Sequence, residues 1–394
     1  MKPKIRFKGF DGEWEESPFS KIIERISTSA QAGKLPGIEF EDIVSGEGRL
    51  NKDIYQKVCC KYGNLFREGD ILFGKLRPYL KNILLADFKG VAIGDFWILR
   101  SKGNDSKYLY TLVNSNSFMK IANISSGSKM PRADWNLVSS TKFAIPSSMD
   151  EQRTIGEHFT SLDAQISACA SRIASLKQIK AASLQAMFPQ EGETVPRVRF
   201  KGFKGEWKKD PLYRFAKKRT EKNTKKLYNI TLTNSAEFGI IDQENFFEHS
   251  ISKSTSITGY FVVREHDFVY NPRISSSAPV GPINQNKLGY VGVVSPLYFV
   301  FEVNGIHRDF LELFFQTTVW HKYMYYKGNT GARFDRIAIS DEDFLKMSVP
   351  DIDLKEQQKI ASYFTSLDRQ ITLHSQHLEK LKQIKAACLD KMFV

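Results

Sequence analysis

The chain has 394 residues, of which 41% are apolar and 26% are charged, and this composition excludes a disordered chain and predicts two to three globular domains. Lysine and arginine number 57 against 44 acidic residues, and the net charge of +13 favours a polyanionic partner such as nucleic acid. The longest uncharged apolar stretch, Leu288–Phe301, is too short to span a bilayer. The first residues have no apolar signal core and the four cysteines form no CxxC pair, so we expect a reduced, cytoplasmic protein.

Two long segments of the chain occur twice. Residues 3–18 and 196–211 share the frame P-x-x-R-F-K-G-F-x-G-E-W-x-x-x-P. Residues 151–188 and 356–393 both begin E-Q-x-x-I-x-x-x-F-T-S-L-D. Because both pairs keep the same order, the sequence predicts a tandem duplication in which each half is a variable block followed by a helical segment.

The variable blocks, residues 1–145 and 196–350, have the pattern of mixed α/β domains. Strands are predicted at Val91–Leu99 and Tyr290–Val303, and helices at Tyr108–Ile121 and Arg308–Lys322. Each block has 23 basic and 16 acidic residues, whereas the helical segments are nearly neutral. Two equally basic lobes suggest a protein that grips DNA at two places.

In the helical segments, apolar residues recur at alternating steps of four and three, which is a heptad seam and predicts that the two helices pair. In the first segment the seam residues are Ile155, Phe159, Leu162, Ile166, Cys169, Ile173 and Leu176. In the second they are Ile360, Phe364, Leu367, Ile371, His374, Leu378 and Leu381. The order block, helix, block, helix makes the expected pair antiparallel.

The layout and the repeated E-Q-x-x-I-x-x-x-F-x-x-L-D segments resemble the specificity (S) subunit of type I restriction–modification enzymes over essentially the full chain. The resemblance implies an α/β fold of the α+β kind, with two globular target recognition domains separated by a long antiparallel two-helix coiled coil in a pseudo-twofold tandem repeat. The domains expected on this basis are a first recognition domain at 1–148, a first conserved helix at 149–188, a linker at 189–195, a second recognition domain at 196–350 and a second conserved helix at 351–394.

In that family each recognition domain reads one half of a bipartite target in double-stranded DNA. The helices dock two methyltransferase subunits, and motor–nuclease subunits join through them. The resemblance implies that this chain has no chemistry and no cofactor of its own, and that S-adenosylmethionine, ATP and magnesium belong to the partner subunits.

Motifs for enzyme chemistry are missing from the sequence, which contains no GxxxxGKS/T, GxGxxG, GxSxG or HExxH. Pro350–Lys355 superficially matches a nuclease motif, but a turn with Asp353 at a helix N-terminus is the better interpretation. His374 lies on the seam and is expected to pack there and not to bind a metal. The alternatives are a self-contained DNA methyltransferase or nuclease, and a basic scaffold that binds RNA.

Candidate DNA contacts are basic residues in loops near glycine, asparagine or proline, because loops reach into grooves and arginine reads guanine edges. In the first block they are Lys75, Arg77, Lys81, Lys129 and Arg132, and in the second they are Lys225, Lys226, Arg273, Lys287, Arg333 and Arg336. Arg77 and Arg273 are expected to be equivalent.

Candidate partner contacts are polar residues that recur in both helices outside the seam. They are Glu151, Gln152, Lys177, Gln178, Glu356, Gln357, Lys382 and Gln383. The repeated aromatic residues of the opening frame, Phe7, Phe10 and Trp14 with Phe200, Phe203 and Trp207, are expected to anchor the core or to contact the helix ends.

Overall fold

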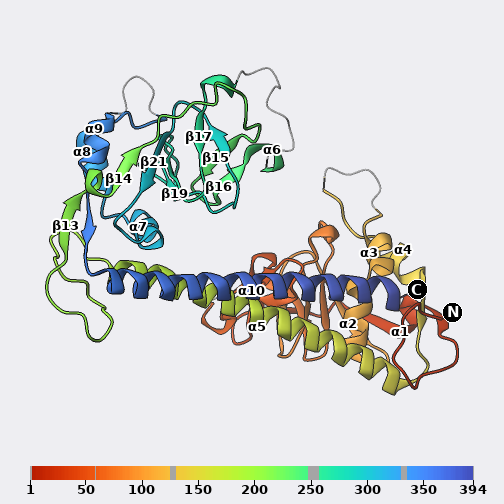
Figure 1. The fold of residues 1–394 in the computed structure, drawn as a ribbon. Helices are drawn as coiled ribbons and strands as arrows, with labels where there is room; N and C mark the ends of the chain where they lie inside the picture. Colours follow the sequence, from red (N-terminus) through yellow and green to blue (C-terminus); the bar gives the residue numbers. More distant parts are fainter. Residues whose placement is uncertain (1, 58, 125–129, 247–256, 330–334, 394) are drawn as a thin grey trace. The chain divides into compact units, whose positions relative to one another are not determined.

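The computed structural model describes residues 2–57, 59–124, 130–246, 257–329 and 335–393 (Figure 1). The chain divides into unit 1, Met1–Ile173 with Leu373–Val394, and unit 2, Ala174–Thr372. Each unit combines one variable block with parts of both long helices, so this division cuts across the domain boundaries expected from the sequence. Within the described ranges, no helix is both long and apolar enough to cross a membrane.

Unit 1 has two four-stranded sheets, with strand orders β2-β11-β8-β9 and β3-β7-β10-β4, and the two-stranded pairs β1-β12 and β5-β6. Its elements are β1 (Glu15–Pro18), α1 (Phe19–Ile22), β2 (Ile23–Ile26), β3 (Ser29–Gln31), β4 (Gly37–Ile38), β5 (Ile43–Val44), β6 (Arg49–Leu50), β7 (Tyr62–Phe66), β8 (Ile71–Gly74), β9 (Ile83–Leu85), β10 (Gly90–Ala92), β11 (Phe96–Ser101), α2 (Ser106–Asn114), α3 (Asn116–Ala122), α4 (Trp135–Ser140) and β12 (Lys142–Ile145).

Unit 2 has one four-stranded sheet of order β14-β21-β18-β19 and the pairs β15-β16, β17-β20 and β13-β22. Its elements are β13 (Lys208–Pro211), β14 (Ala216–Lys218), β15 (Leu232–Ser235), β16 (Gly239–Asp242), α6 (Gln243–Phe246), β17 (Phe261–Val263), β18 (Phe268–Tyr270), β19 (Ile283–Gln285), β20 (Gly292–Val294), β21 (Phe299–Val303), α7 (Arg308–Phe315), α8 (His321–Lys327), α9 (Asp341–Leu345) and β22 (Ser348–Asp351).

The principal sheets of the two units have the same plan. In unit 1, Phe73 of β8 pairs with Ile83 of β9 and with Trp97 of β11. In unit 2, Tyr270 of β18 pairs in the same way with Ile283 of β19 and Phe299 of β21. The duplication therefore extends through the variable blocks, where the sequences have diverged.

Four predicted elements are each broken in two. The run Val91–Leu99 is divided between β10 and β11, which belong to different sheets, and Tyr290–Val303 is divided between β20 and β21. The helix predicted at Tyr108–Ile121 is α2 and α3, because the Ser115 hydroxyl accepts from the backbone N–H of Phe118 and starts a new helix. The helix predicted at Arg308–Lys322 ends at Phe315, and α8 begins at His321.

The two long helices are α5 (Met149–Met187) and α10 (Leu354–Met392). In unit 1 the Cys169 thiol donates to the carbonyl of His374 at 3.2 Å, and Asp163 pairs with Lys385. In unit 2 Lys180 pairs with Asp368 at 2.7 Å. In each unit the residue numbers rise along one helix as they fall along the other, so the helices are antiparallel there. The predicted seam residues are all buried or half-buried.

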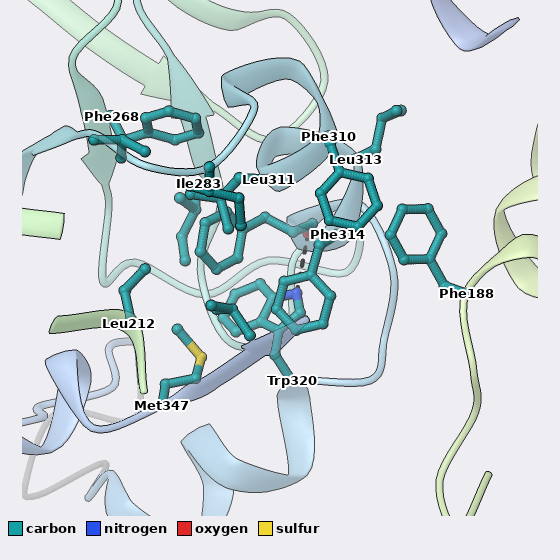
Figure 2. Close-up of a cluster of buried hydrophobic side chains, with 14 of the residues drawn as sticks. Phe188, Leu212, Phe268, Ile283, Phe310, Leu311, Leu313, Phe314, Trp320 and Met347 are labelled. Carbon is teal, nitrogen blue, oxygen red and sulfur yellow. Dashed lines mark hydrogen bonds between the residues drawn. The ribbon is translucent and has the colours of Figure 1, made fainter. Parts of the chain in front are cut away.

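In each unit, a phenylalanine that directly follows a long helix packs into the hydrophobic core. In unit 2, Phe188 follows α5 and stacks on Phe310 at 5.4 Å between ring centroids, within the cluster drawn in Figure 2. Trp320 lies in the same cluster and donates through Nε1 to the carbonyl of Phe315. In unit 1, Phe393 follows α10 and contacts Trp14, Tyr108 and Phe159.

Candidate nucleic-acid and partner interfaces

The opening frame of each repeat is fastened to the start of the long helix that follows it. Arg6 donates to both carboxylate oxygens of Glu151, at 2.6 and 2.8 Å, and to the carbonyls of Asp11 and Gly12. Gly12 has a φ of +80°, which favours glycine, so the turn that receives Arg6 depends on it. The indole Nε1 of Trp14 donates to Glu151 as well.

The second repeat has the same arrangement around its arginine, although Nε1 of the buried Trp207 has no hydrogen-bond partner among the described residues. Arg199 donates to both oxygens of Glu356 at 2.7 and 2.8 Å and to the carbonyl of Gly205, whose φ is +83°. Trp14 and Trp207 are both buried, so these aromatic residues anchor the core at the helix ends, as predicted.

The glutamine of each E-Q pair orients the variable block on the helix. Gln152 accepts from the backbone N–H of Asp105, directly before α2, and donates to the carbonyl of Pro146. Gln357 accepts in the same way from the backbone N–H of His307, directly before α7. Each glutamine therefore fixes the first turn of a domain helix against a long helix.

These contacts correct part of the expected partner surface. Glu151, Gln152, Glu356 and Gln357 were predicted to bind a partner because both repeats retain them. Their exposed fractions are only 1–3%, and their side chains are occupied by hydrogen bonds inside their own units. Internal fastening explains their recurrence, and they offer no surface to a second protein.

The other four predicted partner residues are exposed. Lys177 and Gln178 lie on α5 in unit 2, and Lys382 and Gln383 lie on α10 in unit 1. They occupy corresponding positions in the two repeats, so each unit presents one lysine–glutamine pair to solvent.

Four of the predicted DNA-binding arginines lie where two loops meet at the end of a principal sheet, namely Arg77 and Arg132 in unit 1 and Arg273 and Arg336 in unit 2. In unit 1, residues 75–77 leave β8 and pair with residues 131–133, which lead into α4. Arg77 donates its backbone N–H to the carbonyl of Pro131, and the backbone N–H of Ala133 donates to the carbonyl of Lys75. These bonds enclose an antiparallel bridge between Leu76 and Arg132. We name this the unit 1 bridge, residues 75–77 with 131–133.

The unit 2 bridge, residues 272–274 with 335–337, is built in the same way. The backbone N–H of Ile274 donates to the carbonyl of Asp335, and that of Ile337 donates to the carbonyl of Pro272. Arg273 and Arg336 are the bridged residues. The hydrogen-bond pattern makes Arg336 the counterpart of Arg132, and it makes Arg273 the counterpart of Leu76. The predicted equivalence of Arg77 and Arg273 is therefore wrong by one position.

A carboxylate that the sequence interpretation missed lies in the unit 1 bridge. Asp95 precedes β11 and accepts from Arg132 Nη2 at 3.0 Å and Nε at 3.3 Å, and its other oxygen lies 3.3 Å from Lys75 Nζ. Burial acts to raise the pKa of Asp95, but Arg132 and Lys75 outweigh it and the pKa is lowered. Asp95 is thus held ionised between two predicted DNA-binding residues. A lone aspartate before a strand carries no signal in the sequence.

Other predicted DNA contacts lie apart from the bridges. Lys287 follows β19 at the opposite end of its hairpin from Arg273, and it pairs with Asp309 and Glu312 of α7. Burial acts to lower the pKa of Lys287, but the two acidic residues outweigh it and raise the pKa. The ammonium of Lys287 is therefore already paired with acidic residues of α7.

Lys81 faces inward in unit 1. It lines a pocket of about 340 Å³ with Asp163 and Lys385 of the long helices, and its ammonium donates to the carbonyl of Asn114. Burial, together with Lys385, lowers the pKa of Lys81. Lys225 and Lys226 are exposed in the loop after β14. Lys129 and Arg333 lie outside the described residues.

The residues considered for enzyme chemistry have structural roles. Asp353 accepts through its carboxylate from the backbone N–H of Lys355 at 2.8 Å, so it caps the start of α10 as predicted. His374 is half-buried on the seam, and its backbone carbonyl accepts from the Cys169 thiol. Within the described ranges, no group of three or more histidine, cysteine or acidic side chains is placed to hold a metal ion.

Comparison with known proteins gives a family match for part of the chain and a fold for its length. Residues 205–383 match the family described as the type I restriction modification DNA specificity domain. A chain from a solved type I R-M system matches 97% of this chain over 98% of its own, with 18% identity and a TM-score of 0.53. The S subunit of a type I restriction–modification system from M. genitalium matches 100% of this chain over 99% of its own, with 13% identity and a TM-score of 0.58. A search of curated proteins finds no match.

The family match lies within the second repeat, which the first repeat resembles in sequence and fold. Both repeats have the same opening frame, the same principal sheet and the same bridge. The two solved structures cover 97% and 100% of this chain and have the same fold. In sequence over residues 205–383, and in fold over its length, the chain therefore resembles the DNA specificity subunits of type I restriction–modification systems.

Proposed function

We propose that each unit reads one half of a bipartite DNA target and that the bridges are the edges that meet the bases. The observation that carries this proposal is the repetition of one device in two diverged blocks. In each unit two loops are locked together at the end of the principal sheet, and each bridge includes exposed arginine.

A bridge of this kind suits base reading for two physical reasons. Paired backbones hold their side chains in place, so less conformational entropy is lost when a side chain meets a base. Arginine is suited to the O6 and N7 acceptors of guanine, whereas lysines outside the bridge, such as Lys225 and Lys226, suit the phosphates.

The long helices serve a different partner in this proposal. The exposed pairs Lys177–Gln178 and Lys382–Gln383 occupy corresponding positions, so one kind of surface is presented twice. Two copies of one methyltransferase subunit fit this repetition, and motor–nuclease subunits join through them. S-adenosylmethionine, ATP and magnesium bind to those partner subunits. This chain contributes the DNA specificity and catalyses no reaction itself.

The decisive experiment is methylome sequencing of cells that express the subunit complex with single arginine substitutions. Arg132→Ala should relax one half of the methylated motif, and Arg336→Ala should relax the other half. If either change altered both halves, or if neither changed the motif, base reading by the bridges would be wrong. Tight binding of a methyl donor by the purified chain would revive the enzyme alternative. Stronger competition by RNA than by duplex DNA would favour the RNA scaffold.

A further inference from the structure

In the unit 1 bridge the carboxylate of Asp95 accepts hydrogen bonds from Arg132. The backbone pairing of the bridge does not depend on this contact. Asp95 lies directly before β11, and its backbone carbonyl accepts from the backbone N–H of Lys75 at 2.9 Å. Its side chain takes hydrogen bonds from Arg132 Nε and Nη2. The backbone bond holds Asp95 in place without its carboxylate, so the carboxylate acts mainly on the two cations.

The geometry leaves the reading end of Arg132 available. A guanidinium has five N–H donors arranged as a planar fork. Asp95 takes the Nε edge and one hydrogen of Nη2, and no described residue takes Nη1 or the outer hydrogen of Nη2. Those two groups form the end-on fork that fits O6 and N7 of guanine. Arg132 is 54% exposed, so this fork is open to solvent.

Unit 2 has the arginine but lacks this brace. Trp97 of β11 and Phe299 of β21 occupy the same place in the two sheets, which makes Leu297 the counterpart of Asp95. Leu297 is exposed, and among the described residues the acidic partner of Arg336 is its neighbour Asp335, at 3.5 Å. The two bridges therefore share a backbone plan and differ in the group that orients the arginine.

We propose that Asp95 is a specificity-determining positioning residue, which holds Arg132 in the orientation that reads a guanine in one half of the target and holds Lys75 away from the phosphates. This inference rests on the proposed role of the bridges in base reading. A flexible long side chain loses rotamer entropy when it binds, and the brace removes part of that cost before DNA arrives. The fixed negative charge also disfavours contact with any phosphate that approaches the bridge off register.

The test uses the complex of the full chain with its methyltransferase subunits and a panel of duplexes that differ from the methylated motif at single positions. Asp95→Asn keeps the size of the side chain and removes its charge. It should lower discrimination at one guanine by about fivefold or more, the lower end of what one bidentate arginine–guanine contact provides. Binding to random duplex should strengthen, and its dependence on salt should steepen, because Lys75 is released to the phosphates.

Two variants separate positioning from a structural or purely electrostatic effect. Asp95→Glu keeps the charge and should restore most of the discrimination. Asp87→Asn makes the same change of net charge at the opposite end of the β8–β9 hairpin, where the side chain is exposed, and it should leave base preference unchanged. Equal loss of discrimination in Asp95→Asn and Asp87→Asn would overturn the inference.

Arg132→Ala separates this inference from the proposed function. If Arg132→Ala relaxes one base position while Asp95→Asn leaves that position intact, the bridge reads DNA but Asp95 does not position the arginine. If Arg132→Ala leaves the base preference unchanged at every position of the target, this bridge does not read bases. The proposed role of Asp95 is then wrong as well.

Discussion

Arg6 and Glu151 are 145 positions apart in the chain, yet Nε and Nη2 of the arginine donate to both oxygens of the glutamate, at 2.6 and 2.8 Å. Glu151 is almost fully buried, and its side chain also accepts from Trp14. Because a buried carboxylate that loses its cation keeps the full cost of desolvation, this pair holds the opening frame of the repeat to the long helix.

Removing the arginine should therefore destabilise unit 1 strongly. We expect Arg6→Ala to lower the free energy of unfolding of that unit by about 3 kcal/mol. Hydrogen exchange measured by mass spectrometry should show the loss in unit 1. Arg153→Ala is the matched control, because Arg153 pairs with Asp150 on the surface of the same helix and should matter by less than about 0.5 kcal/mol. Comparable effects of the two substitutions would contradict this account.

Substitutions of base-reading and phosphate-binding residues should have different effects on DNA binding. Arg273→Ala should cost about 1–3 kcal/mol at one position of one half-site and leave other positions unchanged. Arg77→Ala should do the same in the other half-site. Lys225→Ala should weaken binding to all duplexes alike and lower the salt slope by about 1. Titrations at several salt concentrations distinguish the two outcomes, and an arginine whose loss weakens cognate and random DNA equally is not a base reader.

Exchange of a whole block should change half of the target. When residues 196–350 are replaced by the block of a relative that begins with the same opening frame, the first repeat is unchanged, and Glu356 and Gln357 of α10 are retained to hold the new block. The methylated motif should then change in one half and persist in the other. A motif altered in both halves would show that the two units do not read DNA independently.

Charge reversal on the helices tests the partner surface. Lys177→Glu combined with Lys382→Glu should weaken co-purification of the methyltransferase subunits, because both side chains are exposed on repeated positions. The fold should survive, since no ion pair inside the described part of either unit uses these lysines. Lys380→Glu, also exposed on α10, is the control. Full retention of two methyltransferase copies by the double variant would exclude these lysines as docking residues.

A pair of carboxylates should make unit 2 more stable in mild acid. Burial, and then the hydrogen bond with Asp210, raise the pKa of Asp351. A raised pKa means that the folded state binds the proton more tightly than the unfolded state, so the free energy of unfolding should rise as the pH falls through the raised pKa toward the ordinary value of an aspartate. Asp351→Asn should stabilise unit 2 at pH 7 by up to about 1 kcal/mol and remove this pH dependence. Glu237→Gln, an exposed change in the same unit, should do neither.

The parts of the fold that depend on repetition and periodicity could be predicted from the sequence. The heptad seam placed Phe159 and Phe364 at the helix pairing, and both are buried there. The duplication was visible because the frame around Arg6 is constrained by the turn at Gly12 and by Glu151, and few other residues satisfy both. Pattern could not tell that Ser115 interrupts a helix, because an apolar stripe continues across the break.

The sequence could indicate which types of residue form the candidate site, but it could not indicate which positions of the two units correspond. Loop arginines were chosen because arginine suits the edge of guanine, and the structure places Arg132, Arg273 and Arg336 in the bridges, while their contact with DNA stays a prediction. The equivalence of Arg132 and Arg336 depends on backbone hydrogen bonds between segments far apart in the sequence. Recurrence also misled the interpretation of Gln152, because a polar residue kept in both repeats can serve an internal helix start as well as a partner.

The composition of the units sets an order for their completion during synthesis. Unit 2 is one continuous stretch, Ala174–Thr372, whereas unit 1 needs Leu373–Val394 in addition to the first 173 residues. A ribosome, which makes the chain from its N-terminus, therefore releases every residue of the second unit before the first can close. Until Phe393 emerges, the faces of Trp14, Tyr108 and Phe159 that it covers remain open, so the first block made is the last to be finished and the one most in need of protection while it waits.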